Sequence, residues 1–409
     1  MTTTEIAIIG AGVIGLALAE RLTAEGREVV LIDPADPGMG ASYGNAGTIA
    51  DYAVAPVGTP DVLRNLPSLF FSRSSPLAIR HRALPTLAPW LLRFAQQSLP
   101  GPAARNAEAI AALLAGAGPL WQDLAARIGA TEILQPRGCL YLYRSEAERQ
   151  AAEAEMAGRR ALGVSVEVIG AAELAALEPG LPPMAGAAFF RNAIFLNDPG
   201  RMMQILAAHV LSRASHLRAR ATGLTRGPGG VRVEGPDLRL TARHVVIAAG
   251  AHSRVLAAQA GDRVPLDTER GYHVEWDMAQ LPLTRPSCLT QRGFYFCPMA
   301  GRLRVAGTVE LGGLTLPPSP HRIARLVEGA RTVFPDLGVP DREWMGFRPS
   351  MPDSLPVIGP SRGGKDVMLA FGHGHLGVTL APVTAGIVAD QIAGRPAPRA
   401  LPAVSPARF

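Results

Sequence analysis

Six residues near the start of the chain, Gly10-Ala11-Gly12-Val13-Ile14-Gly15, have the spacing GxGxxG. They follow the apolar run 6–9, which reads as a buried strand, and the spacing of apolar residues predicts a helix over 13–24. Glycines here permit a tight turn, so that a pyrophosphate can rest on the amides of the helix N-terminus. A second strand, 28–33, ends at Asp33, whose carboxylate can accept hydrogen bonds from ribose hydroxyls. A glycine turn that merely packs a helix on a strand also fits the bare motif, but the whole unit indicates a dinucleotide site.

Two further glycine-rich segments favour FAD over NAD as the dinucleotide. The small side chains of 41–48 allow a ribityl chain and a flat ring to approach the backbone closely. Residues 371–379 end a predicted strand and begin a helix over 374–393. Its N-terminus can stabilise the negative charge that a flavin gains on reduction. Two distant helix starts of this kind suit one long cofactor, so the sequence predicts FAD.

The predicted FAD contacts come from these segments, from the end of the second strand and from a third apolar run that ends at Ala249-Gly250. They are Gly10, Gly12, Val13, Ile14, Gly15, Asp33, Pro34, Ser42, Asn45, Ala46, Gly47, Thr48, Ala249, Gly250, Gly374, His375, Leu376, Gly377, Val378 and Thr379.

The order of the predicted elements indicates an α/β fold with a discontinuous, Rossmann-like FAD-binding domain. Four runs read as parallel strands of one sheet: 6–9, 28–33, 244–248 and 367–371. Four others read as strands of a mixed or antiparallel sheet in a substrate domain: 138–143, 271–276, 294–298 and 303–309. The expected division assigns 1–135, 195–262 and 341–409 to the FAD-binding domain, and 136–194 and 263–340 to the substrate domain.

Further helices are expected where a capping residue precedes a proline or a glutamate. These starts are Ser145 with Glu148, Asp198 with Pro199, and Ser319 with Pro320. Residues 61–128 read as mainly helical, and the proline-rich tail after Arg395 is expected to be extended.

The composition excludes several classes of protein. The formal charge is +6, but no basic run is interleaved with aromatic residues, so no nucleic-acid partner is expected. Three cysteines without a CxxC pair fit a reduced, cytosolic compartment. The apolar run 6–19 follows Glu5, lacks basic flanking residues and is too short to cross a bilayer. We expect a cytoplasmic protein whose basic surface can meet an acidic inner membrane peripherally.

Longer stretches make the chain similar to a known family. These are the fingerprint through Asp33, the Ser-Tyr-Gly-Asn-Ala-Gly stretch 42–47, and the segments 248–253, 348–359 and 371–377. The chain resembles the D-amino-acid oxidase superfamily of FAD enzymes, and within it the D-amino-acid dehydrogenase branch. The Gly-Asn-Ala-Gly and Phe-Gly-His-Gly-His-Leu-Gly segments are most similar to members acting on D-proline and D-hydroxyproline.

The resemblance implies three catalytic candidates: Arg348, Tyr272 and His375. Arg348 would grip the substrate carboxylate through two parallel hydrogen bonds, although a structural salt bridge is the alternative in so arginine-rich a chain. The Tyr272 hydroxyl would bind the same carboxylate or its ring would line the pocket, the alternative being a ring packed on the sheet. Tyr295 is a weaker candidate. His375 would lie near the substrate, and a metal site at His373 and His375 is not expected, because glycine separates them and no acid is near.

The resemblance also implies the chemistry. Relatives with covalent flavin use a histidine in the N-terminal loop or a cysteine near the C-terminal motif. This chain has neither, so non-covalent FAD is expected. The implied reaction is hydride transfer from the Cα of an amino acid to flavin N5, giving an imine that water hydrolyses.

The expected electron acceptor is a quinone or another carrier. Sarcosine-oxidase relatives use a lysine beside the flavin for oxygen, whereas this chain has only Lys365, in a glycine-flanked turn. An arginine or a protonated His375 is the alternative source of the positive charge. The alternatives are an oxygen-using amine oxidase of the glycine or sarcosine type, and a non-catalytic FAD-binding subunit.

Overall fold

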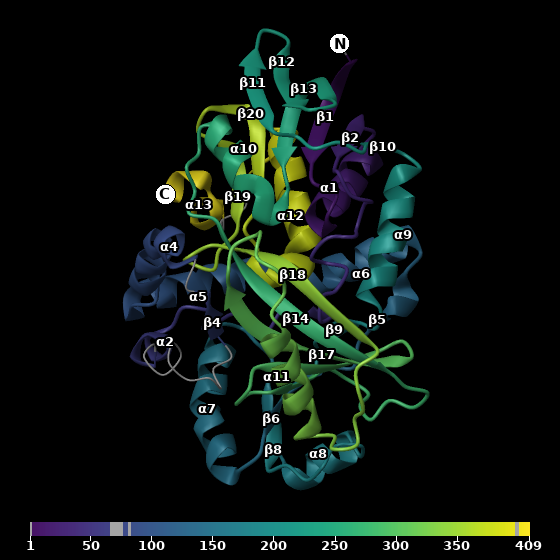
Figure 1. The fold of residues 1–409 in the computed structure, drawn as a ribbon, viewed down its shortest axis with the longest axis vertical. Coiled ribbons are helices and arrows are strands. Elements are labelled where there is room, and N and C mark those ends of the chain that lie inside the picture. Colours follow the sequence, from purple (N-terminus) through teal and green to yellow (C-terminus); the bar gives the residue numbers. More distant parts are fainter. Residues whose placement is uncertain (1, 66–76, 81–82, 397–400) are drawn as a thin grey trace.

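The computed structural model describes residues 2–65, 77–80, 83–396 and 401–409. Two regions are stacked along the long axis of the molecule (Figure 1). The upper one contains the N-terminal strand and the C-terminal helices, and the lower one contains a second sheet with helices α7, α8 and α11. The chain passes between these regions several times, so neither region is one continuous segment.

The upper sheet is built around parallel strands in the order β10-β2-β1-β13, with β20 also pairing with β13. Its strands are β1 (Thr2–Ile9), β2 (Val29–Ile32), β10 (Ser215–Leu217), β11 (Gly223–Gly227), β12 (Gly230–Gly235), β13 (Leu238–Ile247), β19 (Val357–Ser361) and β20 (Gly364–Phe371). The four runs predicted to share one parallel sheet do share it. The antiparallel hairpin β11–β12, which adds to β13, was not among the predicted strands.

Both faces of this sheet are buried at its centre, which explains why residues 6–9, 29–32 and 245–247 are continuously apolar. Ile6 and Ile8 enter the core beneath helices α1 (Val13–Ala24) and α12 (Gly377–Ile392). Ala7 and Ile9 enter a second core on the opposite face, which includes residues of α10 (Ser253–Ala260). Helices α6 (Ala117–Ile128) and α9 (Pro199–Leu211) pack outside α12 and α1 respectively.

The lower sheet has the order β18-β14-β17-β16-β15-β6-β8-β7, with β4 beside β17. Its strands are β4 (Leu77–Ile79), β6 (Cys139–Tyr143), β7 (Glu167–Gly170), β8 (Gly186–Phe190), β14 (Asp267–Asp277), β15 (Ser287–Leu289), β16 (Phe294–Met299), β17 (Arg302–Leu311) and β18 (Arg342–Ser350). The pairs β15–β6 and β17–β4 are parallel and the other pairs are antiparallel, so the predicted mixed sheet is confirmed. Helix α11 (Pro320–Arg331) covers one face. A small sheet of β3 (Thr48–Ile49), β9 (Ile194–Leu196) and β5 (Leu134–Gln135) lies apart from both.

The division into five alternating segments remains a proposal, which the sheets refine at two places. Strand β4 pairs in the lower sheet although it lies within 1–135. Strand β18 extends the same sheet to Ser350, past the proposed boundary at residue 340. We therefore place β4 and β18 with the substrate domain.

The remaining helices are α2 (Pro60–Arg64), α4 (Leu84–Gln97), α5 (Pro100–Leu114), α7 (Glu146–Ala161), α8 (Ala171–Leu177) and α13 (Leu401–Val404). Ser145 and Asp198 cap α7 and α9 by accepting from backbone amides, whereas the Ser319 side chain makes no capping bond at α11. Parts of the helical region expected over 61–128, namely 66–76 and 81–82, lie outside the described residues.

The prediction of an extended tail is wrong for its described part. Residues 401–404 form α13 and Pro406–Arg408 form a 3₁₀ turn. Arg408 donates to the buried Asp353 carboxylate at 2.8 Å, and Arg362 donates to the carbonyl oxygen of Phe409 at 3.0 Å. These contacts dock the tail on the upper domain, which sequence composition alone does not reveal.

Among the described residues, one helical stretch, Pro100–Ile128, is long and apolar enough to cross a membrane. A core helix of a globular protein meets the same criterion. This stretch consists of α5 and α6, and α6 packs against α12 with Trp121 fully buried.

Candidate active site

A cavity of about 770 Å³ lies between the two sheets and is lined by both. At one end are residues that follow the carboxyl ends of β1, β2, β13 and β20, where open parallel sheets bind their ligands. At the other end are residues of β14, β16, β17 and β18. A volume of this size is typical of a cofactor or small-ligand site.

The fingerprint turn forms an open cradle at the first end. No side chain caps α1, and a Cβ added at Gly12 would meet nothing within 4 Å, so the first amides face free space. The Asp33 carboxylate accepts hydrogen bonds from the amides of Ala11 (2.8 Å) and Ala35 (2.9 Å). Each oxygen retains a second lone pair for a ribose hydroxyl. This end therefore fits the pyrophosphate and ribose of a dinucleotide.

A second helix start borders the same cavity. A 3₁₀ turn over Gly374–Leu376 leads into α12, and neither α12 nor this turn has a side-chain cap or an acidic residue in its first turn. Gly374 adopts a φ of +53°, which a side chain would disfavour. Helices α1 and α12 thus present uncapped N-terminal ends to one cavity, as one long anionic cofactor requires.

Most of the predicted cofactor contacts line the cavity. These are Gly10, Gly12, Val13, Ile14, Asp33, Pro34, Ser42, Asn45, Ala46, Thr48, Ala249, Gly250, Gly374, His375, Gly377 and Val378.

Two predicted glycines do not reach the cavity and serve packing instead. A Cβ at Gly15 would lie 1.9 Å from the Gly10 carbonyl oxygen, so this glycine lets α1 pack against the turn. A Cβ at Gly47 would lie 2.5 Å from the Leu196 carbonyl oxygen, where β3 meets β9.

Two predicted contacts on α12 also lie behind the cavity surface. Leu376 is buried in the core beneath the upper sheet. Thr379 accepts a hydrogen bond from the Ala50 amide at 2.9 Å, fully buried. Thr379 therefore supports the chain just after loop 41–48 instead of touching the cofactor space.

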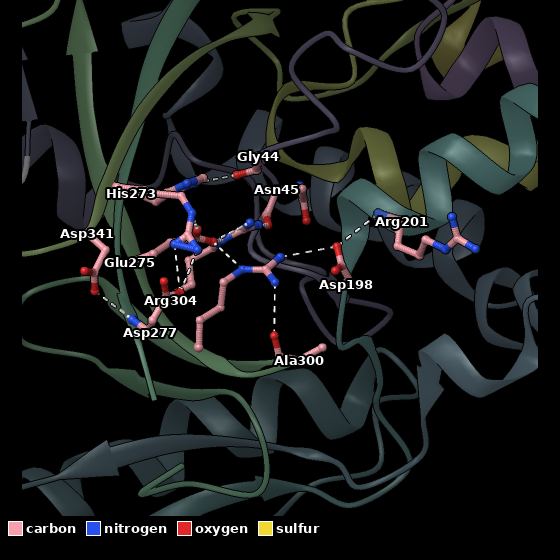
Figure 2. A network of polar contacts seen from close by, with 12 residues as sticks. Gly44, Asn45, Asp198, Arg201, His273, Glu275, Asp277, Ala300, Arg304 and Asp341 are labelled. Atoms are coloured by element: carbon pink, nitrogen blue, oxygen red, sulfur yellow. Dashed lines mark hydrogen bonds and ion pairs between the residues drawn. The ribbon is translucent and has the colours of Figure 1, made fainter. Parts of the chain in front are cut away.

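A polar network from the lower sheet holds the loop at Gly44 and Asn45 (Figure 2). Arg304 donates to the Asn45 carbonyl oxygen and, through Nε, to Glu275 at 2.7 Å. Burial alone would raise the pKa of Glu275, but Arg304 and its other charged neighbours outweigh this and lower it. Arg302 extends the network from Glu275 to Asp198, at the start of α9. Arg304 on β17 thus holds the loop directly, and ion pairs with β14 and the start of α9 hold the arginines in place.

His273 supports the same loop as a neutral side chain. Burial, together with Arg304, lowers its pKa to about 3. Its Nδ1 lies 2.9 Å from the Gly44 carbonyl oxygen, which can only accept, so Nδ1 carries the proton. Trp344 stacks on the imidazole with centroids 5.1 Å apart, and a Cβ at Gly44 would meet the Trp344 ring at 2.3 Å. Glycine at this position therefore allows the loop to lie flat on the ring.

Arg348 lies at the opposite end of the cavity, partly buried. Its guanidinium lies over Gly271, where an added Cβ would be 2.3 Å from Nη2 and 2.4 Å from Cζ. Nη1 donates to the Thr308 carbonyl oxygen at 3.3 Å. In the part of the chain that the structure describes, no carboxylate oxygen forms an ion pair with Arg348 within 4.0 Å. This argues against the structural salt bridge and leaves the guanidinium available to a ligand.

Tyr272 requires a correction. It borders the cavity, but its hydroxyl donates to Glu310 at 3.0 Å and accepts from the Ser319 amide at 3.1 Å. The side chain belongs to the core on the face covered by α11 and is 1% exposed. Alternation along β14 sends it away from Gly271 and His273. Its hydroxyl is therefore not free to bind a substrate carboxylate, although the residue still borders the cavity.

Tyr295, the weaker candidate, lies on the cavity wall. Its hydroxyl donates to that of Tyr141 at 3.0 Å, and both residues line the cavity. Tyr141, Trp344 and Glu269 were not predicted as site residues. They share the cavity face only because β6, β15, β16, β17, β14 and β18 pair in one particular register. No sequence motif marks that register, although the alternation over 138–143 pointed to a strand.

The two histidines of the C-terminal motif have different environments. His375 is open to the cavity, but surrounding protein and Arg348 lower its pKa to about 4. His373 is buried, and its Nε2 lies 2.9 Å from the Thr384 hydroxyl on α12. His375 is therefore a neutral group near Arg348 at pH 7, and His373 ties the motif to α12.

A dinucleotide cradle and an available guanidinium in one cavity are typical of oxidoreductases that use a flavin to oxidise small carboxylates. Comparison with known proteins agrees. The model of the FAD dependent oxidoreductase family, DAO, matches residues 5–391. The chain belongs to this family, so the predicted family membership, FAD cofactor and oxidoreductase class are confirmed.

Individual relatives match over almost their full length. A D-amino-acid oxidase from Bradyrhizobium diazoefficiens is 35% identical over 418 residues, covering 99% of this chain and 98% of the relative. D-amino acid dehydrogenase 2 from Ralstonia nicotianae is 32% identical over 420 residues, covering 96% and 97%. Glycine oxidase from Geobacillus kaustophilus has a similar fold, with a TM-score of 0.80, 23% identity and full coverage of both chains.

Proposed function

We propose that the chain is a D-amino-acid dehydrogenase that oxidises its substrate at Cα, with D-proline and D-hydroxyproline as candidate substrates. The observation that carries this proposal is the guanidinium of Arg348, which lies over Gly271 in the cofactor cavity and forms no ion pair within 4.0 Å with any carboxylate of the described residues. The D configuration rests on the relatives, which are named for D-amino acids.

The side chains at this end of the cavity bind and orient the substrate. Arg348 pairs with its carboxylate through two parallel hydrogen bonds, which fixes both position and rotation. Tyr141 and Tyr295 form an aromatic wall that suits an apolar or cyclic side chain. The α1 and α12 ends of the cavity would hold FAD, which would supply the acceptor for the hydride from Cα, and water would hydrolyse the resulting imine.

The electron acceptor is proposed to be a quinone or another carrier. Among the relatives, one is named an oxidase and another a dehydrogenase, so the electron acceptor has to be inferred from the side chains of the site. Lys365 is exposed at the start of β20, roughly 20 Å of strand away from the cavity at Phe371. His375, with a pKa of about 4, is uncharged at pH 7. Neither supplies the positive charge that would stabilise superoxide beside a flavin. The net charge of +6 supports a cytoplasmic enzyme that approaches an acidic membrane surface holding the quinone.

Anaerobic mixing of the purified yellow protein with D- and L-amino acids tests the substrate. Rapid bleaching by D-proline, D-hydroxyproline or D-alanine supports the proposal, and bleaching by L-amino acids alone contradicts it. Turnover with an electron-accepting dye is then compared with hydrogen peroxide production in air. Peroxide formation as fast as dye reduction would identify an oxygen-using oxidase. A protein that binds FAD but is bleached by no substrate would be the non-catalytic subunit.

A further inference from the structure

A buried acid lies beside the guanidinium at the substrate end of the cavity. Glu269 on β14 is directly opposite Arg348 on β18, so both side chains project from the same face of the sheet. Glu269 is 6% exposed and lines the cavity. The guanidinium of Arg348 lies over Gly271, the next position of β14 on that face, about 7 Å along the strand. A carboxyl group and a guanidinium thus border the same space, at a separation that the two charged groups of a small zwitterion can span.

Glu269 differs in its contacts from two other buried acids of this sheet, which form ion pairs that stabilise the fold. Glu310 binds Arg80, Arg270 and Tyr272 on the opposite face, and Glu275 binds Arg302 and Arg304. Glu269, by contrast, forms no ion pair within 4.0 Å with any described residue, and its neighbours are the Ser350 hydroxyl and the more distant Arg348. Burying a charge without a close partner is costly, so such a group is expected to have a ligand.

The charges of Glu269 and Arg348 indicate what kind of ligand would bind between them. An amino acid arrives as a zwitterion, and its nitrogen must lose a proton before Cα can release a hydride. We propose that Glu269 receives the α-ammonium group of the substrate and accepts that proton. This inference rests on the proposed amino-acid oxidation and adds a second catalytic residue to Arg348.

The proton transfer is balanced in charge. An N–H bond of the ammonium breaks, an O–H bond forms on the Glu269 carboxylate, and the electron pair stays on nitrogen. Before the step, Arg348 and Glu269 cancel and the zwitterion is neutral. After it, the substrate carboxylate cancels Arg348, and both the amine and Glu269 are uncharged. The cavity therefore stays neutral throughout, which a poorly solvated site requires.

The surroundings of Glu269 suit a proton acceptor. Burial raises its pKa, and Arg348 opposes this only in part. Tyr141, Tyr295, His373 and His375 also line the cavity. Burial raises the pKa of both tyrosines and lowers the pKa values of the histidines to about 3 and about 4, so all four are neutral at pH 7. Arg270 and Glu310 lie on the opposite face of the sheet. Glu269 is thus an acid on this wall that faces Arg348, and its raised pKa favours proton uptake.

The test compares the Glu269→Gln holoenzyme with wild type in anaerobic stopped-flow reduction by D-proline and D-alanine from pH 6 to 10. Glutamine keeps the volume but cannot accept a proton. At pH 7 we expect flavin reduction to slow by about thirtyfold to a hundredfold. The rate should approach that of wild type at pH 10, where more substrate nitrogen is already unprotonated. Asp267→Asn is the matched control, since Asp267 lies two residues earlier on the same face, is half-buried and does not line the cavity.

A second measurement separates this role from mere support of Arg348. Tetrahydrofuran-2-carboxylate resembles proline but has no ammonium group. Glu269→Gln should bind it at least as tightly as wild type while binding D-proline more weakly. Equal loss for both ligands, or a rate deficit that does not depend on pH, would overturn the proposal, as would wild-type kinetics at pH 7.

Two further controls keep the result interpretable. If Glu269→Gln fails to retain FAD, Glu269→Asp provides the test. It keeps an acid and is expected to retain more of the pH 7 rate than a Glu269→Ala protein of equal FAD content, and equal rates would refute the proposal. If no amino acid reduces the wild-type flavin, the proposed function is wrong. If wild type is active and Glu269→Gln has the same kinetics, only the inference about Glu269 is wrong.

Discussion

Gly271→Ala should impair catalysis without impairing the fold. The added Cβ would lie 2.3 Å from Arg348 Nη2, whereas ordinary contact begins at 3.4 Å, so the guanidinium must move by about 1 Å. The atoms in the way are the far end of a flexible side chain, and Gly271 has no positive φ, so the cost in folding free energy is small. A misplacement of about 1 Å in a substrate anchor can cost about a hundredfold in rate, roughly 2.7 kcal/mol.

The assay is steady-state kcat/KM with a D-amino acid and a dye acceptor, alongside the Tm and FAD content of each variant. Gly271→Ala should lose about a hundredfold in kcat/KM while its Tm stays within a few degrees of wild type. Gly223→Ala on β11 is the matched control, because its added Cβ would meet only ordinary contacts of 3.5 Å or more. It should behave as wild type.

A double-mutant cycle tests the cause. If Gly271→Ala acts only by displacing Arg348, then Gly271→Ala combined with Arg348→Ala should be no slower than Arg348→Ala alone. Additive losses would show that Gly271 acts elsewhere. Wild-type kinetics in Gly271→Ala would refute the reasoning that the position of the guanidinium is critical.

Four further outcomes are expected. Arg348→Ala should lower kcat/KM by about a hundredfold or more, roughly 3 kcal/mol for a charge-assisted pair, with normal FAD content; unchanged kinetics would return Arg348 to a structural role. Acid precipitation should release the yellow chromophore, and colour retained in the pellet would reveal a covalent bond. Gly12→Val should give a folded but colourless protein by circular dichroism and absorbance, because the new side chain enters open cradle space; a yellow variant would mean that the pyrophosphate lies elsewhere. Burial lowers the pKa of His373 to about 3, so the unfolded chain takes up a proton below about pH 6.5 that the folded chain refuses. Urea unfolding should therefore show stability falling from pH 7 to pH 5, by about 2 kcal/mol from this group, and His373→Gln should flatten that slope.

Local sequence rules predicted the upper domain well because its signals are local. The turn at Gly10 to Gly15, the strands around it and the capping residue Asp198 each depend on neighbours within a few positions. Apolar runs identified the parallel strands, since both faces of that sheet are buried. These rules also placed sixteen of the twenty expected cofactor contacts on the cavity, whereas Gly15 and Thr379 proved to support it from behind.

The substrate end was harder to predict because strand register decides it. Tyr272 and Gly271 are adjacent in sequence, yet one faces α11 and the other seats Arg348. Glu269 joins the site through the pairing of β14 with β18, and Tyr141 joins it through the pairing of β6 with β15, so each depends on strands far apart in the sequence. A family resemblance can suggest that a tyrosine lies near the site, but only the register shows which face it occupies.

The network in Figure 2 places a limit on how such an enzyme can diverge. Strand β14 carries both His273, which holds the cofactor loop at Gly44, and Gly271, which seats the carboxylate anchor. Any shift of this strand would disturb cofactor and substrate together, so few substitutions that move its backbone can be neutral. The wall formed by Tyr141 and Tyr295 has been assigned a role in substrate binding alone. New substrate ranges should therefore arise by exchange at that wall, and a library that varies these two positions while leaving β14 intact is the economical route to redesign.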